Sequence, residues 1–286
     1  MKIIKYFFEF VFIIFLFSIF KLLGFKLASN FGSLIGQLIG PFFRSKKKII
    51  SNIKKGLPDI NDMEIEIIKK KMWKNYGRIL SEYVFIKKFR NSKLDKFVSI
   101  EGKEILDKIK EKKEPVVFIS GHFNNFELMA MQIEKSGVKL AAIYRPLNNI
   151  FLNKIMERIR KQYICQKQIK KGRTGTRELL GAFKENYSIA LMIDQRVSEG
   201  IKANFFGNSA LTTTIPAQLV KKFGCKIVPV YIERFNNFYF KIKFNSPILY
   251  DQNSSIEEIT LDLNKCLEKM ILNNPSQWIW SHNRWK

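Results

Sequence analysis

The chain has 286 residues and carries 50 Lys and Arg against 25 Asp and Glu, which gives a net charge of +25. This length suits one catalytic domain with an anchor segment and allows a sizeable core. The charge predicts an anionic partner: nucleic acid, an anionic membrane face or an acidic protein. Nucleic acid is not the partner that we expect, because no helix-turn-helix, zinc or RNP signature accompanies the charge.

The cysteines are three in number and widely scattered, at Cys165, Cys225 and Cys266. Without a C-x-x-C pair they indicate neither a zinc site nor a disulfide framework, and they fit a reducing compartment. We therefore expect no metal and no cofactor. No catalytic base stands beside Cys165, so an ordinary buried thiol is favoured there over an acyl-carrying nucleophile.

The N-terminus is dominated by Phe, Ile and Leu between Tyr6 and Phe25, with an unbroken apolar core from Phe10 to Phe20. A membrane-spanning helix needs about 20 apolar residues, so both a single span and a shallow anchor remain open. Lys21 and Lys26 argue against a cleaved signal peptide, because they follow the apolar core before any small-residue cleavage site. We expect residues 1–25 to form a membrane anchor and residues 26–286 to form the catalytic domain.

Positive charge is denser after this segment than before it. By the positive-inside rule the main domain stays on the cytoplasmic face of the membrane. The basic residues on the C-terminal side include Arg44, Lys46, Lys47, Lys48, Lys54 and Lys55.

A second apolar segment, residues 27–43, has glycines at four-residue spacing: Gly32, Gly36 and Gly40. Small residues at this interval line one face of a helix and allow close backbone approach. The face could dock on the anchor helix, lie in the membrane interface, or belong to a plain core helix. Pro41 then ends or kinks the helix.

The rest of the chain alternates between helical and extended patterns. Asn61 with Glu64 predicts an N-cap for a helix whose core stripe is Ile65, Ile68, Met72, Tyr76, Ile79 and Tyr83. Strands are expected near 115–120, 139–144, 188–193, 226–233 and 238–244, and helices near 125–137, 148–162, 175–186, 213–224 and 255–272. This alternation predicts an α/β fold: a mixed sheet flanked by helices, preceded by the hydrophobic anchor helix.

One of only two histidines, His122, follows the expected strand 115–120, at the edge where α/β sheets bind ligands. Asn124 or Asn125 can cap the next helix, and Glu127 lies on its first turn. A carboxylate there can fold back toward the imidazole, fix its tautomer and stabilise its cation. A neutral imidazole can take a proton from a hydroxyl near pH 7, and the helix N-terminus offers N–H groups to an oxyanion. The spacing alone is equally consistent with a hydrogen-bonded buried histidine beside an unrelated surface Glu.

The surroundings of His122 and Glu127 form an H-x-x-x-x-E motif within GHFNNFE that resembles the glycerolipid acyltransferase superfamily. In particular, the chain is similar to the late acyltransferases of bacterial lipid A biosynthesis, the lauroyl/myristoyl transferase family. Three further stretches match that family in order: residues 144–149 (YRPLNN), residues 193–195 (IDQ) followed by the threonines 212–214, and residues 275–285 (PSQWIWSHNRW). The resemblance implies an α/β acyltransferase domain across residues 26–286.

Basic residues near this motif can bind phosphates as bidentate guanidinium groups. Arg145 follows the strand near 139–144, at the same sheet edge as His122 if the two strands are parallel. Arg173 lies in a Gly-rich turn. By resemblance to the family, Arg160 and Asp194 occupy positions of functional residues, with Gln195 beside Asp194, and Arg160 is favoured over Arg158. The second histidine, His282, lies among Trp278, Trp280 and Trp285, which we interpret as a structural or interfacial aromatic lid.

The resemblance implies acyl transfer from an acyl carrier protein thioester to a hydroxyl of a lipid A precursor. His122 would act as the base and Glu127 would orient it, on the cytoplasmic face of an inner membrane whose anionic lipids attract the basic chain. One alternative is the same dyad acting on another polar lipid, such as an aminolipid, glycolipid or lysophospholipid. Another is a non-catalytic basic protein that binds anionic lipid or nucleic acid, which would not need His122 and Glu127 together at a strand end.

Overall fold

The computed structural model describes residues 1–91 and 93–286. Within them the strands are β1 (Val98–Glu101), β2 (Val117–Ser120), β3 (Leu140–Tyr144), β4 (Lys167–Lys170), β5 (Ser188–Met192), β6 (Ile201–Phe205), β7 (Asn208–Thr212), β8 (Ile227–Phe235) and β9 (Tyr239–Phe244). The α-helices are α1 (Lys2–Leu23), α2 (Phe25–Ile39), α3 (Lys46–Gly56), α4 (Asp62–Glu82), α5 (Ile86–Arg90), α6 (Lys103–Lys112), α7 (Glu127–Lys135), α8 (Ile150–Tyr163), α9 (Arg173–Lys184), α10 (Ile215–Phe223) and α11 (Ile256–Asn273). Short 3₁₀ turns are η1 (Gly40–Phe43), η2 (Tyr83–Phe85), η3 (Asp95–Phe97) and η4 (Pro275–Gln277).

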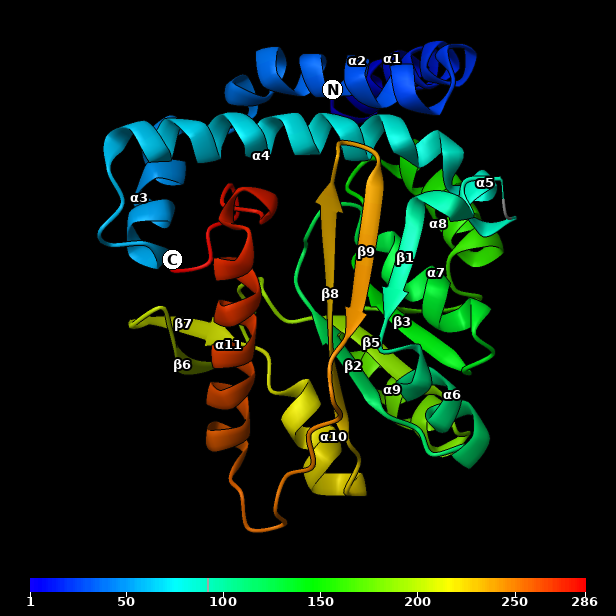
Figure 1. Ribbon diagram of the computed structural model, residues 1–286, viewed down its shortest axis with the longest axis vertical. Helices are drawn as coiled ribbons and strands as arrows, with labels where there is room; N and C mark the ends of the chain where they lie inside the picture. Colours follow the sequence, from blue (N-terminus) through cyan, green and yellow to red (C-terminus); the bar gives the residue numbers. More distant parts are fainter. Residues whose placement is uncertain (92) are drawn as a thin grey trace.

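The main sheet has the strand order β1-β9-β8-β2-β5-β3-β4 among the described residues. Strands β8, β2, β5, β3 and β4 run parallel, whereas β9 is antiparallel to β8. This arrangement confirms the expected mixed α/β sheet flanked by helices. Figure 1 shows α4 crossing the sheet at the end toward which β8 points, which is the carboxyl edge of the parallel strands.

All five expected strands are present, but the sequence analysis missed β1, β4 and the β6–β7 hairpin. Strand β1 pairs with β9, more than 130 residues later, and β4 pairs with β3. These strands are four residues long and only partly buried. Strand β2 is equally short but fully buried, so its sequence is a continuous apolar run. Strands β1 and β4 have no such run, and long-range pairing decides their structure.

The helix expected after Asn61 is confirmed as α4, with a capping box between Asn61 and Glu64. Its expected core stripe is buried except for Tyr76 and Ile79, which are half-buried. The expected cap of α7 was wrong. The helix begins after Phe126 without a side-chain cap. The Nδ2 groups of Asn124 and Asn125 donate to Gln277 and Glu82, and their Oδ1 atoms accept no hydrogen bond from the helix.

The glycine stripe of α2 faces α4, and not the anchor helix. A Cβ on Gly77 of α4 would lie 1.8 Å from the Gly32 carbonyl oxygen, and one on Gly36 would lie 2.3 Å from the Trp73 carbonyl oxygen. The two helices therefore approach each other with backbone against backbone, which no larger residue permits. The glycine stripe therefore does dock on another helix, but that helix is α4 and not the expected anchor helix.

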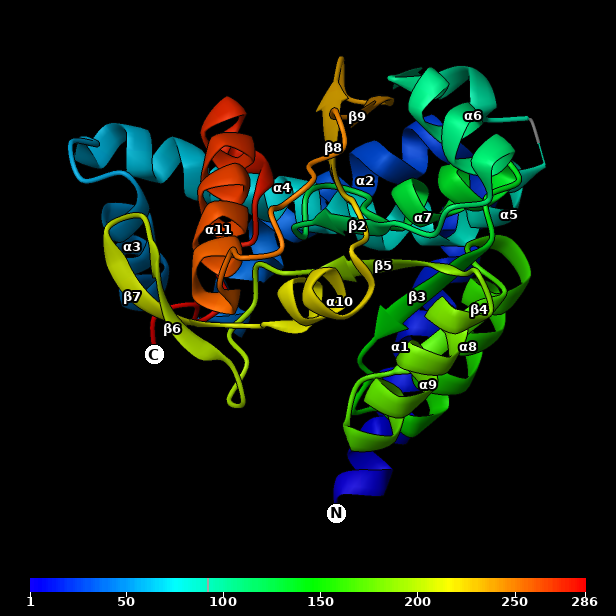
Figure 2. The same ribbon diagram turned by 90° about the horizontal axis from the view of Figure 1, so that it is seen from below.

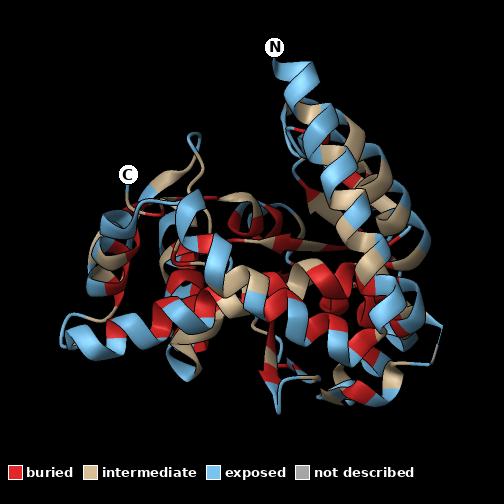
Figure 3. Cartoon of the chain, turned by 90° about the horizontal axis from the view of Figure 1, so that it is seen from above, coloured by how far each residue is buried: buried red, intermediate tan, exposed pale blue. Residues whose placement is uncertain are grey.

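Helix α1 is long and apolar enough to cross a membrane, judged by length and composition alone. Figures 2 and 3 show it extending from the body of the molecule alongside α8, with most of its surface exposed. Its inner side packs on the start of α8, where the ring of Phe151 lies 5.7 Å from that of Phe10. The Asn149 amide donates hydrogen bonds to the Tyr6 carbonyl at 2.8 Å and to the Glu9 carboxylate at 3.2 Å. The Glu9 carboxylate, although it lies on the apolar helix, thus has a hydrogen-bond donor in the body of the protein.

Candidate active site

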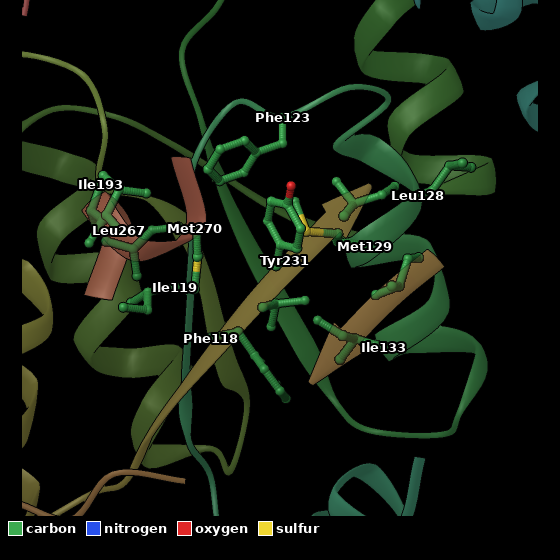
Figure 4. Packing of buried hydrophobic residues seen from close by; sticks show 14 of the residues in the cluster. Phe118, Ile119, Phe123, Leu128, Met129, Ile133, Ile193, Tyr231, Leu267 and Met270 are labelled. Carbon is green, nitrogen blue, oxygen red and sulfur yellow. The ribbon is translucent and has the colours of Figure 1, made fainter. Parts of the chain in front are cut away.

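Strands β2 and β5 are direct neighbours, and their register builds the site. Ser120 pairs with Met192, and the Ile193 N–H donates to the Ser120 carbonyl at 2.9 Å. The pairing therefore continues past the ends of both strands, and it brings His122 and Asp194, each two residues further on, side by side. Figure 4 shows the apolar packing on the two sides of β2, where Ile119 lies beside Leu267 and Met270 of α11 and Phe118 lies on the side of Tyr231 of β8 and Ile133 of α7.

The Asp194 carboxylate holds His122 at two points. Its Oδ1 lies 2.7 Å from the imidazole Nδ1, and its Oδ2 accepts the His122 backbone N–H at 2.7 Å. The Trp278 indole N–H donates to the same Oδ2 at 3.0 Å. Asp194 is fully buried, whereas 23 % of the His122 side chain is exposed. The imidazole is therefore fixed at Nδ1 while its other edge can meet a substrate.

The electrostatics of the pair favour a charged imidazole. Burial opposes the charge, but the Asp194 carboxylate outweighs burial and raises the pKa of His122 above its ordinary value of 6.5. For Asp194, burial again opposes ionisation, but His122 and the Trp278 indole hold the pKa of the carboxyl below 3.8. An imidazolium formed during proton transfer is thus stabilised where it forms.

Glu127 lies near His122 but bonds to another residue. Arg160 of α8 donates to its Oε1 from Nε at 2.8 Å and from Nη2 at 2.5 Å. Both side chains are about nine-tenths buried. The hydrogen bond that the sequence analysis expected between Glu127 and the imidazole is formed by Asp194, and Glu127 instead fixes Arg160. The charge of Glu127 still favours the imidazolium form of His122.

The loop between β2 and α7 is held by the C-terminal segment. The Asn124 amide donates to Gln277 Oε1 and to the Ile232 carbonyl, and Gln277 Nε2 donates to the Arg234 carbonyl at 2.8 Å. Asn124 has a φ of +40°, a left-handed conformation that Asn tolerates better than most residues. Asn125 donates to the buried Glu82, which forms a bidentate pair with Arg234. These contacts fix the loop that carries His122.

Other side chains of the closing segment also have partners inside the protein. Trp278 and Trp280 are fully buried, so the expected aromatic lid is an internal clamp and not an interfacial surface. His282 Nε2 accepts the Arg196 N–H at 3.1 Å, and burial lowers the pKa of His282. The buried Arg284 donates to the Leu211 carbonyl and to Thr212 Oγ1, each at 2.7 Å.

The structure places the other expected site residues as follows. Arg145 is exposed at the end of β3, and β3 is parallel to β2 through β5, so the expected shared edge is confirmed. Gln195 is half-buried beside Asp194, and Arg158 is exposed on α8. Arg173 begins α9, but its side chain lies outside the described residues. Cys165 is buried and burial raises its thiol pKa to about 12, which disfavours a nucleophilic role.

Sequence reasoning missed two residues that hold the site. Trp278 was read only as part of an aromatic cluster, yet its indole N–H donates to the buried Asp194 carboxylate. Tyr144 was quoted as part of a motif, yet its ring lies 5.7 Å from the Arg160 guanidinium and its hydroxyl donates to Glu157 at 2.6 Å. Neither contact has a local sequence signal, since the partners are 84 and 13 residues away.

Comparisons with known proteins show the family of the chain. The sequence model of the family described as "Bacterial lipid A biosynthesis acyltransferase" matches residues 1–286. The chain is similar to the lipid A biosynthesis palmitoleoyltransferase of Escherichia coli K12, with 23 % identity over 259 residues, covering 89 % of this chain and 83 % of that one. It is 22 % identical over 263 residues to the lipid A biosynthesis lauroyltransferase of the same organism, covering 88 % of this chain and 83 % of the relative.

A third relative is the lipid A biosynthesis acyltransferase 2 of Shigella flexneri, with 23 % identity over 256 residues, covering 86 % of this chain and 79 % of that one. The family match covers both the apolar N-terminus and the closing segment that holds Asp194, so it is not a match to one motif. The chain belongs to the bacterial lipid A biosynthesis acyltransferase family.

Proposed function

We propose that this protein transfers a fatty acyl chain from an acyl carrier protein thioester to a hydroxyl of a lipid A precursor. The observation that carries the proposal is the pairing of a partly exposed His122 with a buried Asp194 at the carboxyl edge of the sheet. Family membership and the names of the relatives support the acceptor class.

In the proposed reaction His122 is the general base. Its ring edge opposite Nδ1 takes the proton of the acceptor hydroxyl while the hydroxyl oxygen attacks the thioester carbonyl carbon. The imidazolium is stabilised by Asp194. The tetrahedral intermediate then collapses, the C–S bond breaks, and the imidazolium returns its proton to the leaving thiolate. The products are an ester and the free carrier thiol, and neither an acyl-enzyme nor a metal takes part.

Glu127 and Arg160 complete the proposed site. Glu127 holds the Arg160 guanidinium on the side of α7 where His122 lies, and a guanidinium there can stabilise an oxyanion or bind an acceptor phosphate. The N–H groups of the first turn of α7 can support the same oxyanion. Three residues that come shortly after strands β3, β4 and β5 are proposed as further contacts to the polar substrate: Arg145, Arg173 and Gln195.

We propose that residues 1–25 anchor the protein in a bacterial inner membrane, with residues 26–286 as the acyltransferase domain on the cytoplasmic face. The exposed apolar surface of α1 supports the anchor, and the basic residues that follow it support the orientation and attraction to anionic lipids. An acyltransferase acting on another polar lipid through the same residues is the second candidate, because nothing in the His122–Asp194 geometry selects the acceptor.

The test uses the full-length chain in detergent with a lipid A precursor and two donors, an acyl carrier protein thioester and a coenzyme A thioester. Mass spectrometry of the acceptor identifies the ester, and His122→Ala is the inactive control. With the carrier donor, kcat/KM should fall steeply with ionic strength, because a +25 enzyme meets an acidic protein by long-range attraction that is screened within about 10 Å at 0.1 M salt.

Two outcomes separate the parts of the proposal. Equal use of the coenzyme A ester at every salt concentration would exclude the carrier donor but leave acyl transfer intact. Transfer to a lysophospholipid or glycolipid with no product from the lipid A precursor would replace the acceptor with the second candidate.

A further inference from the structure

A basic pocket of about 340 Å³, which shares no lining residue with the His122–Asp194 site, lies where the end of α2 and the start of α3 meet α4. In Figure 1 this is the end of α4 nearest α3. The lining residues come from all three helices and from η1: Gln37, Pro41, Arg44, Lys46, Ile49, Glu66, Lys69, Lys70 and Trp73. Trp73 and Ile49 are buried and supply apolar lining beside the charged side chains.

The walls carry four positive side chains against one carboxylate. Glu66 accepts from Lys69 Nζ at 2.7 Å and lies 3.3 Å from Lys46 Nζ, so it fixes both ammonium groups in place. Lys69 is only 8 % exposed, whereas lysine side chains are mostly exposed in folded proteins. Arg44 and Lys70 have no ion-pair partner among the residues that the structure describes. The pocket therefore keeps an excess of positive charge that its own carboxylate does not neutralise.

The rim of the pocket is strongly apolar. Phe42 and Phe43 of η1 are 88 % and 73 % exposed, directly beside Pro41 and Arg44. The face of α2 opposite its glycines continues this surface with Leu27, Phe31, Leu34 and Leu38, all exposed. Contiguous exposed apolar side chains next to a basic site are typical of a surface that meets lipid at the level of the headgroups.

We propose that this pocket binds the phosphate group of a membrane lipid, with the lipid chains lying against Phe42, Phe43 and the outer face of α2. Arg44 and Lys70 supply the unpaired charges, Gln37 supplies a neutral donor, and Lys46 and Lys69 are held in place by Glu66. Arg is suited to phosphate because its guanidinium offers parallel N–H groups, and Lys adds a point charge. The site is separate from the His122–Asp194 pair and does not depend on the proposed acyl transfer.

The test is a binding titration of the full chain in neutral detergent with short-chain lipids. Binding is measured by calorimetry and by tryptophan fluorescence, to which Trp73 in the pocket lining contributes. The probes are dihexanoyl phosphatidic acid, dihexanoyl phosphatidylcholine and inorganic phosphate. Arg44→Gln/Lys70→Gln should weaken phosphatidic acid binding by about tenfold or more, the effect expected from losing a charge-assisted hydrogen bond. Both residues are exposed, so circular dichroism should show an unchanged fold.

The matched control is Lys47→Gln/Lys48→Gln, which removes the same charge from exposed positions at the start of α3, where neither residue lines this pocket. It should leave phosphatidic acid binding within about twofold of wild type. Equal losses in the two double variants would show diffuse surface charge and overturn the proposal. Inorganic phosphate binding as tightly as the lipid would also overturn it, since the apolar rim would then contribute nothing. A loss of affinity for an apo acyl carrier protein, with lipid binding unchanged, would reassign the pocket to a protein partner.

Discussion

His122 and Asp194 are 72 residues apart in the chain, yet each lies two residues past a registered pair, Ser120 and Met192, of neighbouring parallel strands. The contact is therefore set by backbone pairing and not by flexible side chains. Strand β2 is buried on both faces and most of β5 is buried as well, so a slip of one residue would disrupt the close packing of side chains on both sides of the sheet. The register that stabilises the core thus also fixes the distance between the His122 imidazole and the Asp194 carboxylate.

Asp194→Asn should lower kcat/KM by about 10²–10⁴-fold, the usual range for a disturbed general base. The acid limb of the pH profile should also move to lower pH. Wild-type His122 has a raised pKa and must lose its proton to act as the base, so activity rises as pH passes upward through that value. Without the carboxylate the imidazole deprotonates at lower pH. An unchanged acid limb would mean that Asp194 does not set the His122 pKa.

The same pair should link stability to pH. The folded-state pKa of His122 is raised, so its contribution is full below about 6.5 and is lost as pH rises through the folded value. The folded-state pKa of Asp194 is lowered, so its contribution is full above about 3.8 and is lost as pH falls through the folded value. The gap in unfolding free energy between wild type and His122→Gln should therefore be largest from about pH 4 to 6.5. Denaturant titrations across pH measure it, and a gap that grows toward pH 9 would contradict the linkage.

Glu127→Gln should destabilise the fold by about 3 kcal/mol, because it leaves Arg160 charged and unpaired in a buried site. The double variant Glu127→Gln/Arg160→Met should recover much of this loss, which a double-mutant cycle by urea unfolding can measure. Activity should be low in both variants. If Glu127 acted directly on the imidazole, Glu127→Gln would shift the acid limb more than Asp194→Asn does, and the structure predicts the reverse order.

Trp278→Phe should remove the indole hydrogen bond to Asp194 while keeping an aromatic side chain in the buried cluster. A lost hydrogen bond to a buried carboxylate costs about 1.5–3 kcal/mol, so we expect at least about a tenfold fall in kcat/KM and a raised Asp194 pKa. The matched control is Trp280→Phe, which removes an indole hydrogen bond to the Pro275 carbonyl at 2.6 Å. The control should lose stability but keep the wild-type pH profile. Identical pH profiles for the two variants would rule out a positioning role of Trp278.

Gly77→Ala should destabilise the packing of α2 on α4, because its Cβ would lie 1.8 Å from the Gly32 carbonyl oxygen. Overpacking of this kind costs about 1–3 kcal/mol. Gly181→Ala is the matched control, since that helical position has no atom within 4 Å of the added Cβ. It should stabilise α9 by about 0.5–1 kcal/mol. Thermal unfolding in detergent compares the two, and a neutral Gly77→Ala would show that the helices can separate freely.

The sequence alone determined those features that depend on neighbouring residues. The apolar run of α1, the capping box at Asn61, the strands β2, β3, β5, β8 and β9, and the place of His122 after β2 were all readable. Their causes are local: side-chain period, turn chemistry and chain breaks by Gly and Pro. The lipid A acyltransferase resemblance was readable for a similar reason, since its motifs are short runs of residues that keep their order along the chain.

Tertiary structure alone decided which residues meet. Glu127 is five residues from His122, but the imidazole bonds to Asp194, because the β2–β5 register places Asp194 at Nδ1 and the start of α7 turns Glu127 toward Arg160 of α8. In the same way the glycines of α2 have a spacing that predicts close packing, but only the fold selects α4 as their partner. Contacts between residues far apart in the chain depend on sheet order and helix docking. No local pattern encodes that order, so the identity of a side chain's partner came from the assembled fold.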